Sequence, residues 1–75
     1  MKNKETFSEN LKNLRKIRKL SKTKLGELIG VERTAIWNYE TGIRFPTIET
    51  LIAIADYFDV SLDYLVGRID NSDEQ

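Results

Sequence analysis

The sequence has neither cysteine nor histidine, and these two absences narrow its possible chemistry. Without cysteine, the chain has no disulfide scaffold and no cysteine-based metal site. Without histidine, it lacks the commonest general base and the commonest metal ligand. The only carboxylate cluster is Asp56, Asp59 and Asp63, which we interpret as a solvated helix face. We therefore expect a protein that is not an enzyme and that has neither metal nor cofactor.

Long apolar runs are also missing. No stretch approaches the roughly 18 apolar residues of a membrane span, and the N-terminus "MKNKETFSEN" lacks the apolar segment of a signal peptide. We therefore expect a soluble, cytoplasmic protein without a membrane partner.

The formal net charge is zero, but basic and acidic residues are unevenly distributed along the chain. Residues 1–45 contain eleven basic and five acidic residues (+6), whereas residues 46–75 contain one basic and seven acidic residues (−6). Such asymmetry indicates that one surface meets a polyanion, although chance clustering on a short chain is an alternative.

Helical periodicity runs through most of the chain, and 75 residues with 40% apolar content predict one small domain. The capping-box spacing of Thr6 and Glu9 predicts where the first helix begins. Its apolar stripe should contain Phe7, Leu11, Leu14 and Ile17.

Cap residues divide the remainder into four further helices. The second should span residues 22–29, after Ser21 and before Gly30, and the third about 32–40, before Gly42. The fourth should run from the cap Thr47 to about residue 58, and a short fifth should follow Ser61 and stop near Gly67. The residues that we expect to be buried in the second to fourth helices are Leu25, Leu28, Ile29, Ile48, Leu51, Ile52, Ala55 and Phe58. The fifth helix should hold Leu62, Leu65 and Val66.

The third predicted helix has two different faces. At about 100° per residue, Tyr39 and Glu40 fall on the same side as Ile36 and face the core. Four residues point outward or lie at the edge of that face: Arg33, Thr34, Trp37 and Asn38. An exposed indole needs a partner, and we expect Trp37 to stack on the aliphatic stem of Arg33.

The connection between the second and third helices is short and glycine-rich. Gly26 lies within the second helix, where glycine costs roughly 1 kcal/mol relative to alanine. We interpret it as a place where another helix crosses too closely for a Cβ atom. Together with the glycine turn at Gly30 and the apolar Val31 and Ile36, this spacing predicts a helix-turn-helix.

The stretch "LSKTKLGELIGVERTAIWNYETGIRFPTIETLIAIADYFDVSLDYLVG" strongly resembles the lambda-repressor-like helix-turn-helix family of phage repressors, Cro proteins and bacterial regulators. The resemblance implies a compact, all-α domain of five helices over residues 1–67, with a polar acidic tail or linker at 68–75. It also implies that the third helix enters the major groove, that the second spans the phosphates, and that the protein is bacterial or phage-encoded and associated with the nucleoid.

The resemblance also implies roles for individual residues. The base-reading set is Arg33, Thr34, Trp37 and Asn38, with Trp37 at its edge. The phosphate-binding set is Ser21, Lys22, Thr23, Thr41, Arg44 and Thr47, whereas Lys16, Lys19 and Lys24 are interpreted as sources of long-range attraction. Arg15 and Glu40 correspond to a structural ion pair between the first and third helices.

Three residues depart from the family pattern. Glu32 replaces a Ser or Thr cap, Trp37 replaces a polar residue, and Phe45 replaces a charged one. Phe45 forms an apolar bump with Ile43, which either fills the core or contributes to a dimer contact.

The sequence therefore predicts a sequence-specific regulator that binds double-stranded DNA. We expect repression, with a homodimer on a palindromic operator. The alternative is an antitoxin-like or anti-repressor module that holds a protein partner, which exposed apolar residues at Ile43, Phe45, Val66 and Ile69 would favour.

Overall fold

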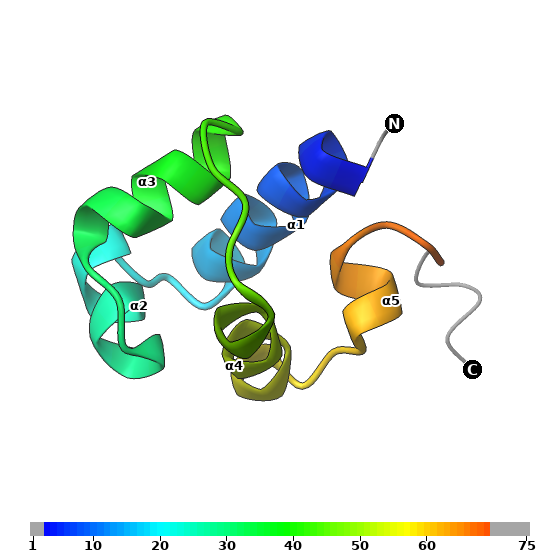
Figure 1. Ribbon diagram of the computed structural model, residues 1–75. Helices are drawn as coiled ribbons and strands as arrows, with labels where there is room; N and C mark the ends of the chain where they lie inside the picture. Colours follow the sequence, from blue (N-terminus) through cyan, green and yellow to red (C-terminus); the bar gives the residue numbers. More distant parts are fainter. Residues whose placement is uncertain (1–2, 70–75) are drawn as a thin grey trace.

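The computed structural model describes the backbone of residues 3–69 and the side chains of residues 6–69, and its regular structure is entirely helical there. Five helices follow one another along the chain: α1 (Asn3–Ile17), α2 (Lys22–Ile29), α3 (Arg33–Thr41), α4 (Ile48–Phe58) and α5 (Leu62–Leu65). In Figure 1, α2 and α3 lie together at one end, α5 lies at the other, and α1 passes behind. The predicted five-helix, all-α class is confirmed.

Side-chain caps define where three of the helices begin. Ser21 accepts a hydrogen bond from the Lys24 amide at 3.0 Å, and Thr47 accepts one from the Thr50 amide at 3.3 Å. Ser61 accepts a third from the Tyr64 amide at 2.9 Å. Each bond satisfies an amide that has no acceptor within its own helix. The three predicted N-caps are confirmed.

The predicted start of α1 is wrong, because the helix continues through the expected capping box and begins at Asn3. The hydroxyl of Ser8, inside this box, instead donates to the carbonyl of Tyr39 at 2.6 Å. Ser8 therefore connects α1 to α3 in the interior.

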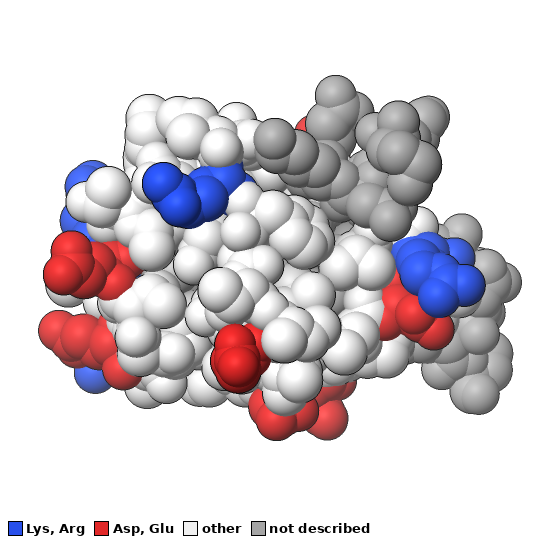
Figure 2. Space-filling model, viewed as in Figure 1, with Lys and Arg blue, Asp and Glu red and all other residues white. Residues whose placement is uncertain are grey.

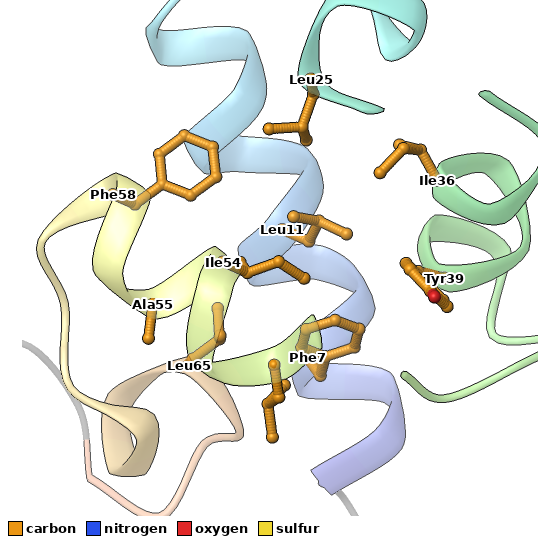
Figure 3. Packing of buried hydrophobic residues seen from close by; sticks show 10 residues of the cluster. Phe7, Leu11, Leu25, Ile36, Tyr39, Ile54, Ala55, Phe58 and Leu65 are labelled. Carbon is orange, nitrogen blue, oxygen red and sulfur yellow. The ribbon is translucent and has the colours of Figure 1, made fainter. Parts of the chain in front are cut away.

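All five helices contribute side chains to one apolar core (Figure 3). In this view Leu11 of α1 lies between Ile54 of α4 and Ile36 of α3, with Leu25 of α2 above them. Phe7 meets the ring of Tyr39 edge to face, with ring centroids 6.3 Å apart. The remaining members come from α4 and α5: Leu51, Ile54, Ala55, Phe58 and Leu65. Burial of these side chains fixes the positions of α2 and α3.

Four residues expected in the core are exposed: Ile17, Leu28, Ile48 and Ile52. On α4 the buried stripe contains Ile54, which the sequence analysis did not select, between Leu51 and Phe58. Ile52 lies about 100° around the helix from Leu51, outside the strip that the other helices cover. Ile17 is the last residue of α1.

The end of the described chain folds back on α5. The carbonyl of Asp63 accepts hydrogen bonds from the amides of Arg68 at 2.7 Å and Ile69 at 3.3 Å. Val66 and Ile69 are half-buried, so their predicted exposure is wrong. Of the predicted tail at 68–75, residues 70–75 lie outside the described residues.

A separate property concerns membranes: between residues 3 and 69, no helix combines the length and apolar character needed to span one.

Candidate nucleic-acid interface

The turn between α2 and α3 fixes the angle between the two helices. Gly30 ends α2 in the left-handed conformation, with φ of 85°. The amides of Gly30 and Val31 both donate to the carbonyl of Gly26, each at 2.8 Å. A Cβ atom on Gly26 would overlap the carbonyl oxygen of Val31. The neighbour that excludes a side chain there is therefore the backbone of the turn, and the predicted crossing helix is wrong.

One face of α3 packs against the core, and the opposite face is open to solvent. Ile36, Tyr39 and Glu40 are buried, whereas Arg33 and Thr34 are exposed and Asn38 is half-buried. Glu32 occupies the N-cap position but makes no side-chain cap bond, so the first amides of α3 have no side-chain acceptor there. The outward face expected from the helical periodicity is therefore present.

A buried ion pair ties α3 to α1, as the sequence predicted. The Nε of Arg15 donates to Oε2 of Glu40 at 2.6 Å, and Nη2 donates to Oε1 at 3.0 Å. A third bond runs from Nη1 to the carbonyl of Leu20 at 2.8 Å. The hydrogen bond to Glu40 raises the pKa of Arg15, although burial acts in the opposite direction. The guanidinium therefore stays charged, and this two-pronged contact fixes the rotation of α3.

The candidate phosphate-binding residues lie around α3 in two groups. Ser21, Lys22 and Thr23 stand at the start of α2, while Thr41 ends α3 and Arg44 and Thr47 follow it. The Thr41 hydroxyl donates within its own helix, to the Trp37 carbonyl at 2.8 Å, so it must rotate to donate to a phosphate. The Thr47 hydroxyl likewise donates to Oγ1 of Thr50 at 3.2 Å. Arg44 and Thr23 are exposed, and Lys22 is half-buried.

Trp37 is 43% exposed and lies at the edge of the outward face. Within residues 6–69 the cation–π contacts both belong to Arg18, over Tyr57 and Phe58. The packing of the Trp37 ring on the aliphatic stem of Arg33 stays a prediction. The indole borders a hollow of about 210 Å³ between α1, α2 and α3, which is lined by Lys12, Arg15, Lys16, Lys22, Trp37, Glu40 and Thr41.

The sequence analysis did not single out Lys12, and it gave Lys16 no fixed contact. The two residues lie four apart on α1 and so share a helix face. That spacing is visible in the sequence, but the identity of the elements opposite this face depends on how the helices pack.

Of the two apolar residues in the loop after α3, Ile43 and Phe45, only Phe45 packs against the core. The ring of Phe45 meets Phe7 edge to face, with centroids 5.1 Å apart, although 41% of Phe45 is exposed. Ile43 stays exposed, and so do Ile48 and Ile52 on α4.

Charge is mixed on the visible face. Figure 2 shows basic and acidic side chains side by side at the end formed by α2 and α3. One such pair is Lys24 and Glu27, whose Nζ and Oε1 atoms are 3.9 Å apart. The positive first half of the sequence therefore does not give a uniformly positive face in this view.

Two helices joined at a fixed angle by a glycine turn, the second with a free polar face, define a helix-turn-helix domain. The helix-turn-helix family model matches residues 11–65, and the chain belongs to this family. Its fold is that of the lambda-repressor-like domains.

Relatives with similar sequences agree with this family assignment. The chain is 48% identical over 60 residues to the helix-turn-helix-type transcriptional regulator YqaE of Bacillus subtilis, covering 80% of this chain and 52% of YqaE. It is 37% identical over 62 residues to the cryptic phage CTXphi transcriptional repressor RstR of Vibrio cholerae, covering 83% of this chain and 55% of RstR. The chain thus spans about half the length of these relatives.

Among solved structures, the P22 c2 repressor in complex with synthetic operator 9T superposes with a TM-score of 0.77 and 32% sequence identity. The match covers 80% of this chain and 91% of the repressor.

Proposed function

We propose that this chain binds double-stranded DNA in a sequence-specific manner and regulates transcription, with α3 in the major groove. The observation that carries the proposal is the division of α3 into two faces. Its inner face is fixed by the core and by the Arg15–Glu40 pair, while its outer face offers Arg33 and Thr34 to solvent. A rigid helix with free polar side chains fits the width of the major groove.

The outer face has the chemistry needed to read bases. Arginine matches O6 and N7 of guanine, and asparagine matches N6 and N7 of adenine. Threonine offers a hydroxyl and a methyl group. We assign base reading to Arg33, Thr34 and Asn38, with Trp37 at the edge of the set, where its ring contacts a sugar or a thymine methyl group.

Contacts to the phosphates of the DNA backbone complete the proposed interface. The start of α2 has free amides, a positive dipole end and no acidic residue in its first turn, which together favour a phosphate. We assign phosphate contacts to Ser21, Lys22 and Thr23 on that side. Thr41, Arg44 and Thr47 contact phosphates on the other side.

We further propose that two copies bind a palindromic operator and that repression results when they exclude polymerase. Two recognition helices about 34 Å apart would reach half-sites separated by one helical turn. The name of RstR as a repressor supports this direction of regulation.

The proposal predicts strong salt dependence. The logarithm of the association constant should fall linearly with the logarithm of salt concentration, by about 0.9 for each phosphate neutralised. Lys22 and Arg44 alone predict a slope of about −1.8 per domain. The measurement is a fluorescence-anisotropy titration at several salt concentrations, with a duplex selected from a random pool by the purified chain. A flat profile, or no enriched duplex, would contradict DNA binding.

Base reading and phosphate binding should separate on mutation. Arg33→Ala should cost about 1–3 kcal/mol on the selected duplex and relax the preference at one base pair. Arg44→Ala, which also removes one exposed arginine, should weaken all duplexes alike. The measurement is the affinity of both variants for the selected duplex and its single-base-pair variants. If Arg44→Ala changes base preference, its assignment to phosphate is wrong.

The second candidate is a protein-interaction module. Three exposed isoleucines near the loop after α3 favour it, because Ile43, Ile48 and Ile52 leave apolar area open to a partner. This function predicts tight binding of a protein with little salt dependence and no selection of duplexes.

A further inference from the structure

Glu32 occupies the N-cap position of α3, but the helix does not use its side chain. The carbonyl of Glu32 accepts hydrogen bonds from the amides of Ala35 at 3.0 Å and Ile36 at 3.3 Å, so the helix holds the backbone of this residue. The carboxylate makes no cap bond. The cap hydroxyls of α2, α4 and α5, in contrast, each accept a hydrogen bond from an amide of their helix.

The carboxylate of Glu32 is also without a cationic partner. Among side chains 6–69, the acidic members of ion pairs are Glu27, Glu40 and Asp63. Glu32 is exposed. This carboxylate, on a fixed backbone, can therefore accept a hydrogen bond from a molecule that approaches the start of α3.

The position of Glu32 places this acceptor beside the proposed base-reading residues. Glu32 directly precedes Arg33 and Thr34, which are also exposed. In helix-turn-helix proteins, the N-terminal residues of the second helix of the motif contact base edges in the major groove. The turn before α3 is fixed, because the amide of Val31 donates to the carbonyl of Gly26 at 2.8 Å. In the proposed complex, the carboxylate therefore enters the groove together with Arg33.

A carboxylate at this position has an electrostatic cost. DNA phosphates are negative, so the like charge of Glu32 weakens binding to every duplex, whatever its sequence. A particular sequence offsets this loss only if it offers a hydrogen-bond donor to the carboxylate. Glu32 should therefore weaken non-specific binding and strengthen binding to that sequence.

Cytosine is the base whose major-groove edge suits a carboxylate. Guanine presents N7 and O6 there, and thymine presents O4, and all three atoms are acceptors that repel a carboxylate. Adenine has a donor at N6, but its N7 acceptor lies next to it. Cytosine offers the N4 amino group without an acceptor of the same base beside it, and acidic side chains pair with this group.

We propose that Glu32 determines specificity by accepting a hydrogen bond from the N4 amino group of a cytosine, near the base pair that Arg33 reads. This inference rests on the proposed function, since it requires α3 in the major groove. It adds a residue to the base-reading set and names one base of the operator half-site. The same carboxylate rejects duplexes that carry another base at that position.

The first experiment selects duplexes from a random pool with the unmodified chain, Glu32→Ala and Glu27→Ala. Glu27 is exposed on α2, and its substitution is the matched control because it makes the same change in charge. We expect the unmodified chain and Glu27→Ala to enrich cytosine at the same position. Glu32→Ala should accept all four bases there, because it has no acceptor for the amino group.

The second experiment tests the contacted atom. N4-methylcytosine replaces each cytosine of the selected duplex in turn, which puts a methyl group in place of the amino hydrogen that faces the major groove. One replacement should weaken the unmodified chain and Glu27→Ala by about 5- to 150-fold, the range for one mismatched base pair. The same replacement should not change the affinity of Glu32→Ala.

Affinities for two duplexes distinguish base reading from a defect in folding. Glu32→Ala should bind the selected duplex more weakly and a random duplex more tightly, whereas a folding defect would weaken both. Glu27→Ala should leave the ratio of the two affinities unchanged. The Glu32 side chain makes no cap bond, so the melting temperature of Glu32→Ala should stay close to that of the unmodified chain.

The cytosine preference and the effect of the methyl group must both disappear in Glu32→Ala. If either one remains, or if Glu32→Ala binds the selected duplex more tightly, the inference is overturned while the proposed function stands. If the unmodified chain enriches no duplex, the proposed function fails, and this inference fails with it.

Discussion

Replacing Glu40 with alanine should lower the free energy of unfolding by about 3–5 kcal/mol, the usual range for removing one partner of a buried ion pair. Arg15 would lose two of its three hydrogen bonds, and its side chain is only 9% exposed in the unmodified chain. The measurement is urea denaturation followed by circular dichroism. DNA affinity should fall in parallel, because the rotation of α3 is no longer fixed.

A double substitution provides the control for this result. Arg15→Met/Glu40→Met removes both charges and keeps apolar volume, so it should recover most of the lost stability. Some loss should remain, because the carbonyl of Leu20 also loses its bond from Arg15. If Glu40→Ala abolishes DNA binding without changing the unfolding curve, Glu40 is a contact residue and its structural role is wrong.

Gly26→Ala should destabilise the protein by about 2–3 kcal/mol, near the upper end of ordinary overpacking. Alanine gains roughly 1 kcal/mol in helix propensity over glycine, but its Cβ would overlap the Val31 carbonyl oxygen. That atom belongs to the backbone of the turn, so relief requires α3 to move relative to α2. We therefore expect the Gly26→Ala variant to have both a lower free energy of unfolding and a lower affinity for DNA.

Glu27→Ala is the matched control, because it lies on the same helix and is exposed. Its effect on stability should stay within about 0.5 kcal/mol. A Gly26→Ala variant that is more stable than the unmodified chain would show that the turn backbone moves at little cost. It would contradict the explanation that the Val31 carbonyl oxygen excludes a Cβ atom at this position.

The caps, the turn glycines and the family of this protein were predictable from the sequence. Ser21, Thr47 and Ser61 cap the helices that the sequence assigned to them. Gly30 and Gly42 end α2 and α3 in the left-handed conformation. These features were accessible because each depends on hydrogen bonds between residues only a few positions apart. The start of α1 was not predicted correctly, and neither was the bond from Ser8 of α1 to the carbonyl of Tyr39, 31 positions away.

Only the tertiary structure decided which part of each apolar stripe is covered and what stands opposite each polar face. Ile54 is buried while Ile48 and Ile52 are exposed, because the neighbouring helices cover one strip of α4 that periodicity alone locates only approximately. Trp37 was correctly expected at the edge of the outer face, but periodicity did not predict that it borders a hollow that lysines of α1 and α2 also line. Helical periodicity gives the direction of a side chain relative to its own axis, and only the packing of helices against one another determines what that side chain meets.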